Sequence, residues 1–290
     1  MNTILVAGAS GVLGRLVVQQ LLQRGVSVRV LSRTVARASS AGTNDRLTQV
    51  IADLTRPASL TGACHSVDAV ISCAGASMNM KAMGDRTSFT AVDLHGNDAL
   101  LQEAKRSGVR KFVYVSVAGE GPYEATEYVR AHRQFEERLA ASGIAYSVVR
   151  PAGFYAFLAE IFAMARQGRG FIIGDGSNRT NPVHEREVAL ACVAALERSE
   201  SMIQAGGPEI FTRRQIVELA FRVAGRTPSI ISVPPALFSV MTSPLRLINP
   251  RIHALLDFGK AVSTADAVVP VYGTERLEGY FTALRDGSAV

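Results

Sequence analysis

A glycine-rich turn near the start of the chain joins an apolar run to an amphipathic stretch. The short, β-branched run Ile4–Ala7 predicts a strand, and residues 15–24 have the spacing of an amphipathic helix. The residues between them, 8–14, read GASGVLG. A strand that passes through so short a turn into a helix constrains the fold strongly, because the helix must pack back against the sheet that holds the strand.

Each glycine of this turn has a steric reason to be there. Gly8 allows a tight turn out of the strand, Gly11 lets a pyrophosphate approach the backbone, and Gly14 lets the helix lie close to the sheet. The helix N-terminus presents free N–H groups and the positive end of its dipole to the phosphates. The sequence therefore predicts a dinucleotide site, although a βα turn that holds no ligand is the alternative. The residues that we expect to form it are Gly8, Ser10, Gly11, Val12, Leu13 and Gly14.

Strand and helix patterns alternate through the first half of the chain. Apolar runs predict further strands at residues 26–31, 47–51, 69–72, 111–116 and 145–149. Helical spacing is found at 92–107 and 128–142, each closed by a glycine. Repeated βα units of this kind predict an α/β fold with a doubly wound parallel sheet.

After Pro151 the alternation stops. Helical patterns are found at 154–166, 188–196 and 212–224, whereas the glycine-rich stretch 168–181 predicts a loop or hairpin. We therefore expect a dinucleotide-binding domain over residues 1–152. Residues 153–290 are expected to form a small, mixed C-terminal substrate lobe, with segments at about 178–196 returning to the sheet.

Composition excludes several classes of protein. With 48% hydrophobic residues the chain is globular, yet it has no uncharged apolar stretch of eighteen residues or more, so we expect no membrane span. The most apolar candidate, residues 228–250, is broken by prolines and predicts a core or surface helix. The chain begins with a strand, so we expect no signal peptide. The three cysteines lack metal or redox spacing and indicate a reducing compartment, hence the cytoplasm.

The formal net charge of +6 is spread along the chain without a basic run. This distribution makes nucleic-acid binding unlikely, and a positive field that attracts an anionic cofactor is the simpler interpretation. No cluster has the spacing of metal ligands, so we expect no metal site.

The end of the second predicted strand indicates which dinucleotide is bound. An acidic residue there would bind the ribose hydroxyls of NAD, but the chain reads Leu31-Ser32-Arg33-Thr34. Arg33 can pair with a 2′-phosphate, Ser32 can donate to it, and Arg37 lies one turn further on. We therefore predict NADP(H) rather than NAD(H), with an exposed loop arginine as the alternative.

The Gly-x-x-Gly-x-x-Gly spacing resembles the short-chain dehydrogenase/reductase superfamily, in its extended and atypical branches. The segment 142–151, SGIAYSVVRP, is similar to the Arg-Pro turn of the atypical, NmrA-like NAD(P)-binding group. The resemblance implies a Rossmann fold. It also implies that Asp53 and Leu54 meet the adenine, although Asp53 is equally consistent with a helix N-cap. It places Cys73, Ala74 and Gly75 along the path of the cofactor and Pro151 beside the nicotinamide.

The same resemblance implies a catalytic set of Ser116, Tyr128 and His132. In the superfamily a Ser orients the substrate carbonyl, and a Tyr four residues before a Lys acts as general acid or base. Here His132 stands in the Lys position, and a protonated imidazole could assist Tyr128 only below about pH 7. Arg130 and Arg133 are expected to point elsewhere on the helix. The alternative is that Tyr128 and His132 have only packing or surface roles.

These observations support a functional hypothesis and two alternatives. The first is an NADPH-dependent reductase of a small, fairly apolar carbonyl or enone, with Phe154, Tyr155 and Phe157 as an apolar wall. The second is a non-catalytic NADP(H)-binding sensor or assembly protein, which the missing Lys favours. An epimerase or dehydratase that recycles its cofactor is a third. His184 is expected to be structural, and an oligomer is possible.

Overall fold

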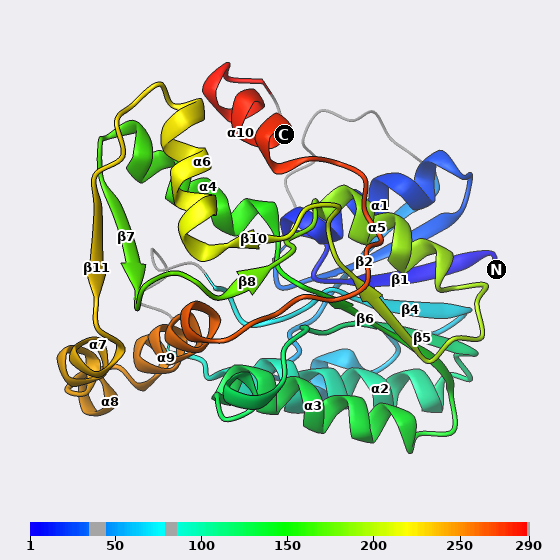
Figure 1. Cartoon of the computed structure of the whole chain (residues 1–290). Helices are drawn as coiled ribbons and strands as arrows, with labels where there is room; N and C mark the ends of the chain where they lie inside the picture. The colour runs from blue at the N-terminus through cyan, green and yellow to red at the C-terminus, as the bar shows by residue number, and fades with distance from the viewer. Residues whose placement is uncertain (35–44, 79–85, 289–290) are drawn as a thin grey trace.

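The computed structural model describes residues 1–34, 45–78 and 86–288, and its centre is a seven-stranded parallel sheet (Figure 1). The strand order is β3-β2-β1-β4-β5-β6-β9. Because the order reverses between β1 and β4, the carboxyl ends of these two strands form the crevice in which such sheets bind ligands. The strands are β1 (Thr3–Ala7), β2 (Ser27–Ser32), β3 (Leu47–Ile51), β4 (Ala69–Ser72), β5 (Lys111–Val115), β6 (Ala145–Pro151) and β9 (Met202–Ala205).

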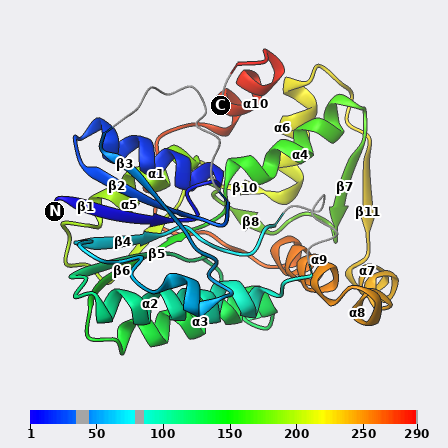
Figure 2. The same cartoon turned by 180° about the vertical axis from the view of Figure 1, so that it is seen from behind.

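Helices cover both faces of the sheet (Figures 1 and 2). One face carries α1 (Val12–Gln23) and α5 (Glu185–Ala194), and the other carries α2 (Asn97–Arg106) and α3 (Glu127–Ala140). A π-helix, η2 (Thr90–Gly96), leads into α2. The doubly wound α/β fold predicted from the alternating pattern is therefore confirmed.

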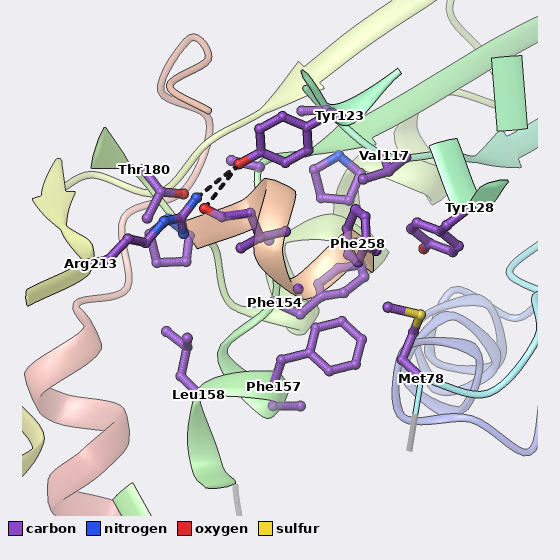
Figure 3. Close-up of a pocket in the computed structure, with 18 of the residues that line it drawn as sticks. Met78, Val117, Tyr123, Tyr128, Phe154, Phe157, Leu158, Thr180, Arg213 and Phe258 are labelled. Atoms are coloured by element: carbon purple, nitrogen blue, oxygen red, sulfur yellow. Dashed lines mark hydrogen bonds between the residues drawn. The ribbon is translucent and has the colours of Figure 1, made fainter. Parts of the chain in front are cut away.

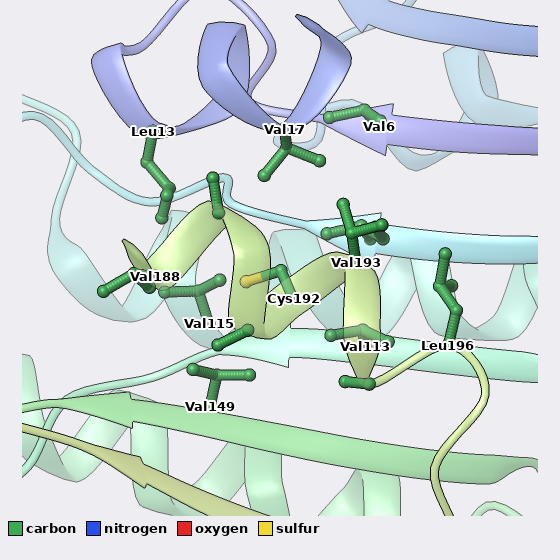
Figure 4. Close-up of a cluster of buried hydrophobic side chains, with 14 of the residues drawn as sticks. Val6, Leu13, Val17, Val113, Val115, Val149, Val188, Cys192, Val193 and Leu196 are labelled. Atoms are coloured by element: carbon green, nitrogen blue, oxygen red, sulfur yellow. The ribbon is translucent and has the colours of Figure 1, made fainter. Parts of the chain in front are cut away.

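The core beneath α1 and α5 explains why the central strands are apolar on both faces. Figure 4 shows Val113, Val115 and Val149 of the sheet facing Cys192 and neighbouring side chains of α5. On the other face, Leu5, Val70 and Phe112 pack against α2 and α3 residues such as Leu101 and Phe135. A parallel sheet covered on both sides has no strand face open to solvent, so its strands are mostly apolar.

Two segments that follow residue 152 belong to the sheet layer and not to the C-terminal lobe. Helix α5 packs against α1, and β9 pairs in parallel with β6 at the sheet edge. The pattern of the sequence did not identify β9, which is short and partly exposed. The predicted boundary at residue 152 stays a prediction.

The hairpin considered for residues 168–181 is wrong. Strand β7 (Gly170–Ile173) pairs in parallel with β11 (Ile230–Val233), and β8 (Arg179–Thr180) pairs antiparallel with β10 (Phe211–Thr212). Each short strand therefore takes its partner from a later part of the chain, which local turn signals do not reveal.

The remaining elements lie over the carboxyl ends of the strands. Helices α4 (Tyr155–Arg166), α6 (Arg213–Val223) and α10 (Leu277–Arg285) share a second apolar core that includes Phe162, Phe221 and Phe281. Helix α9 (Pro250–Thr264) lies beside α3 and carries α7 (Pro235–Thr242) and α8 (Leu245–Ile248). Two short 3-10 turns, η1 (Pro57–Leu60) and η3 (Gly121–Tyr123), complete the described elements.

The apolar stretch 228–250 forms surface elements, one of the two arrangements expected. Its helices α7 and α8 bury no residue, and Leu247 is 90% exposed. Within the described ranges, no helix combines the length and the apolar character needed to cross a bilayer.

We predict that Gly14→Ala destabilises the protein by about 1–3 kcal/mol, the usual cost of overpacking. A Cβ at this position would overlap the Gly8 carbonyl oxygen, and the contact is between two backbone segments that cannot easily move apart. Urea unfolding measures the effect. Gly279→Ala in the exposed part of α10, where a Cβ meets nothing within 4 Å, is the matched control and should be neutral or stabilising. An equal loss in both variants would contradict the prediction.

Candidate functional site

The glycine turn has the geometry that a bound pyrophosphate requires. Gly8 has φ of +75°, and a Cβ there would lie 2.6 Å from the Cys73 carbonyl carbon at the end of β4. The Gly11 N–H donates to the Gly8 carbonyl at 3.0 Å, which closes the turn. Gly11 is also the N-cap of α1 and offers no side-chain cap, so the first N–H groups of the helix can bind an anion.

The other predicted residues of the turn differ in what they can offer. Ser10 is exposed, and its carbonyl accepts a hydrogen bond from Arg15 Nη1 at 2.5 Å. Val12 is also exposed, whereas the Leu13 side chain lies in the core below α1 (Figure 4). Leu13 can therefore contribute only backbone to a ligand.

Ser32 and Arg33 lie at the carboxyl end of β2, as the NADP(H) prediction requires. The Ser32 hydroxyl donates to the Thr34 carbonyl at 2.8 Å and accepts from Gln49 Nε2 at 2.5 Å, so it is already engaged. Arg33 is exposed beyond it. Arg37 lies outside the described residues.

Asp53 follows β3 and faces Arg33. Burial acts to raise the pKa of the Asp53 carboxyl, but hydrogen bonds from Thr55 and the charges of Arg33 and Arg56 outweigh it and hold the pKa below its usual value. Its Oδ1 accepts from the Thr55 N–H at 2.9 Å, which closes a local turn and is not an N-cap of η1. Leu54 beside it is buried.

The segment Cys73–Gly75 is held by two polar residues that the sequence analysis did not identify. Asn97 Nδ2 donates to the Ala74 carbonyl at 3.1 Å, and Asp93 Oδ2 accepts from the Ala76 N–H at 3.3 Å. A Cβ on Gly75 would lie 2.6 Å from Asp93 Oδ1. The available signal was the presence of two polar residues, 93 and 97, on the otherwise apolar face of the predicted helix.

Ser116 lies at the end of β5 in a buried ionic cluster. Its hydroxyl donates to Glu136 Oε1 at 2.5 Å, and Arg150 also binds this carboxylate. Arg133, which was expected to point elsewhere than Tyr128 and His132, reaches this cluster: its Nη1 lies 2.9 Å from Glu136 Oε1 and 3.4 Å from Ser116 Oγ. Arg133 sits one helical turn before Glu136, so both side chains reach the same strand end. The cluster fixes the Ser116 hydroxyl.

Tyr128 and His132 share one face of α3, with ring centroids 4.6 Å apart. His132 is buried, and its Nδ1 lies 2.5 Å from the Tyr114 hydroxyl. Its Nε2 lies 3.5 Å from Asp93 Oδ1, and neither of these two atoms has a hydrogen-bond partner among the described residues.

Burial keeps these groups neutral. It lowers the pKa of His132 to about 3 and raises the pKa of Asp93 to about 8. It also raises the pKa of Tyr128 well above its usual value, with a further contribution from Asp93. The protonated imidazole considered as an aid to Tyr128 is therefore absent at neutral pH, because charging a buried imidazole costs too much free energy.

A cavity of about 630 Å³ opens between the sheet and the C-terminal helices (Figure 3). Ser116, Tyr128 and Pro151 line it on the sheet side, so the structure brings these predicted residues together. Phe154 and Phe157 also line it, while Tyr155 is buried in the second core. Its volume is typical of a pocket for a small molecule.

Four polar residues of this cavity were missed in the sequence, namely Tyr123, Glu160, Thr180 and Arg213. They come from four separate segments, so no local pattern unites them. The predicted structural role of His184 is confirmed, since its Nδ1 accepts from the Arg186 N–H at 3.0 Å and caps α5. In the part of the chain that the structure describes, no group of three His, Cys, Asp or Glu side chains could hold a metal ion.

Comparison with known proteins supports the dinucleotide site. A family model described as NAD(P)H-binding matches residues 8–199, about two thirds of the chain. The divinyl chlorophyllide a 8-vinyl-reductase of Zea mays is 28% identical over 99% of this chain and 80% of its own length. The photosystem II assembly factor Ycf39 of Synechocystis sp. is 27% identical over 93% of this chain and 84% of its own length.

Solved structures show the same fold. The NADPH-dependent quinone oxidoreductase QOR2 of Escherichia coli, complexed with NADPH, has a TM-score of 0.76 at 18% identity, over 97% of this chain and 99% of its own. The UDP-glucose 4-epimerase of Thermus thermophilus, complexed with NAD, has a TM-score of 0.67 at 20% identity, over 91% of this chain and all of its own. The chain therefore belongs to the NAD(P)H-binding family, in the atypical short-chain dehydrogenase/reductase, NmrA-like group that its motifs predicted.

Proposed function

We propose that this protein is an NADPH-dependent reductase of a small, fairly apolar carbonyl or enone. The observation that carries the proposal is the apolar cavity, which lies at the carboxyl ends of β5 and β6 with Tyr128 in its wall. A protein that only bound a dinucleotide would not need this additional cavity beside the expected position of the nicotinamide.

The glycine turn and the strand ends fit the cofactor. The backbone around Gly8, Gly11 and Gly14 would hold the pyrophosphate, and Arg33 would bind the 2′-phosphate. Ser32 would join Arg33 by turning its hydroxyl from the Thr34 carbonyl to the phosphate. Asp53 and Leu54 would meet the adenine, and Cys73, Ala74, Gly75 and Pro151 would line the path to the nicotinamide. When bound, NADPH supplies the hydride, and the chain supplies position, proton and exclusion of water.

Tyr128 would act as the proton donor. A phenol whose pKa is raised stays protonated at neutral pH, and it can still protonate an alkoxide, which is the stronger base. Tyr128 would therefore donate its proton to the substrate oxygen as negative charge develops there. Ser116 would position the carbonyl by turning its hydroxyl from Glu136 to the substrate oxygen, and the neutral His132 would position the Tyr128 ring.

A non-catalytic NADP(H)-binding role in sensing or assembly is the second candidate. The neutral His132 in place of a lysine and the engagement of Ser116 with Glu136 favour it, because both weaken the usual proton-transfer set. The similarity to an assembly factor is consistent with the same role.

We predict that Arg33→Gln weakens NADPH binding at least tenfold and leaves NADH binding within about twofold, because the lost hydrogen bonds to a charged group concern only the 2′-phosphate. Fluorescence titration with each cofactor measures both affinities. Arg24→Gln at the far end of α1 is the matched control and should change neither. Equal weakening of NADPH and NADH would contradict the assignment.

We predict that Tyr128→Phe lowers the rate of NADPH oxidation with aldehyde, ketone and enone substrates at least a hundredfold, as expected when a general acid is lost. NADPH affinity should be unchanged. Tyr146→Phe, outside the cavity, is the control. Tight NADPH binding by the unmodified protein without oxidation across the substrate panel would reject the reductase and support the non-catalytic role.

We predict that the free energy of unfolding of Asp93→Asn, minus that of the unmodified protein, increases by about 1 kcal/mol or more between pH 5 and pH 8. The folded-state pKa of Asp93 is raised to about 8, so its stabilising contribution is complete below about pH 4 and is lost as pH rises towards 8. Urea unfolding at several pH values measures this difference. Asp68→Asn is the control: hydrogen bonds from the Thr3 and Asn2 N–H groups hold the pKa of the Asp68 carboxyl below its usual value, so the stability difference for this variant should stay constant between pH 5 and 8. A flat difference for Asp93→Asn would show that the carboxyl is ionised when buried.

A further inference from the structure

The cavity has a polar end that lies away from Tyr128. Figure 3 shows Arg213 and Thr180 together on one side, with Tyr123 above them, and Tyr128 on the opposite side. Apolar side chains lie between the two ends, and those labelled are Met78, Val117, Phe154, Phe157, Leu158 and Phe258. A ligand that fills this space would therefore meet a cation at one end and the phenol at the other.

Arg213 is partly buried and makes few contacts for a guanidinium in that position. Its Nη2 donates to the Tyr123 hydroxyl at 2.9 Å, and its Nε is buried without a hydrogen-bond partner within the described residues. The Thr180 hydroxyl oxygen is likewise buried and unpartnered there. Burial lowers the pKa of Arg213, although a guanidinium remains charged in any protein. An unmatched buried charge destabilises the folded state.

No carboxylate in the described part of the chain lies within ion-pair distance of Arg213. Asp266 faces it from outside the cavity and is bound to Arg179, while Glu160 lines the cavity on α4 without pairing with it. Arg213 is also the first residue of α6, so its positive charge adds to the positive end of the helix dipole. The electrostatics of this end of the cavity therefore favour an anion.

We propose that Arg213, held in place by Tyr123, binds a carboxylate together with Thr180 at one end of an otherwise apolar substrate. The proposal rests on the proposed reductase function for the other end, where the reducible group lies against Tyr128. A carboxylate matches the planar guanidinium and can also accept from the Thr180 hydroxyl, whereas the Tyr123 hydroxyl already donates to the Ala265 carbonyl at 3.3 Å and holds Arg213 in place. The substrate class is thus an apolar carboxylic acid that carries a carbonyl or enone away from its acid group.

The test uses two fluorescent probes that differ mainly in charge. 8-Anilinonaphthalene-1-sulfonate is anionic, and N-phenyl-1-naphthylamine is its neutral counterpart. Both are titrated into the NADPH-saturated full-length protein, and octanoate and octan-1-ol are then compared as competitors. The variants are Arg213→Gln, Arg213→Lys and, as a matched control on the exposed side of the same helix, Arg222→Gln.

We expect Arg213→Gln to weaken the anionic probe at least tenfold and the neutral probe less than twofold, since only a charge-assisted contact is lost. Arg213→Lys should recover part of the loss, and Arg222→Gln should behave like the unmodified protein. Octanoate should compete at least tenfold better than octan-1-ol. Equal weakening of both probes, or equal competition by acid and alcohol, would overturn the proposal.

Two further measurements separate this result from folding and from turnover. If Arg213→Gln unfolds, as thermal melting would show, Arg213→Lys decides the question: it keeps the positive charge but not the planar fork, so it must bind the anionic probe more weakly than the unmodified protein does and still prefer it to the neutral probe. Probe binding needs no hydride transfer, so it can succeed when every substrate fails to oxidise NADPH. Conversely, turnover of neutral ketones with no effect of Arg213→Gln on either probe would retain the reductase and reject the carboxylate site.

Discussion

The close approach of α1 to β1 is the constraint on which the rest of the structure depends. It exists because Gly14 and Gly8 lack side chains where their backbones meet, and because Gly8 adopts a left-handed conformation. The approach directs the open N-terminus of α1 at the crevice between β1 and β4. The same packing leaves room on that face for α5, which returns from the second half of the chain to complete the core.

Exclusion of water shapes the chemistry on the other side of the crevice. Asp93, His132 and Tyr114 are buried behind Tyr128, and burial favours the neutral form of each group. A neutral surrounding does not lower the pKa of Tyr128 as a nearby cation would. The site is therefore better suited to donating a proton than to removing one, which agrees with reduction as the proposed direction.

Much of the fold was predictable because its signals are local. The strands at residues 69–72 and 111–115 contain the apolar runs 69–71 and 112–115, and α1 and α3 begin at a glycine turn and at an N-cap threonine, respectively. Strand β9 and the parallel pairing of β7 with β11 escaped prediction, since each is short and depends on a partner far along the chain. Asp93 and Asn97 were overlooked for a related reason: they hydrogen-bond to the backbone of Ala76 and Ala74, in a loop that is remote from them in the sequence.

The sequence by itself determined the dinucleotide turn, the doubly wound sheet and the family. These follow from glycine spacing and apolar periodicity, which act over a few residues. Only the tertiary structure decided that His132 is neutral, that Arg133 reaches Ser116, and that Arg213 faces the same cavity as Tyr128. The charge state of a side chain depends on its burial, and the contacts between these residues depend on how segments remote in the chain pack together. A local sequence pattern determines neither of these.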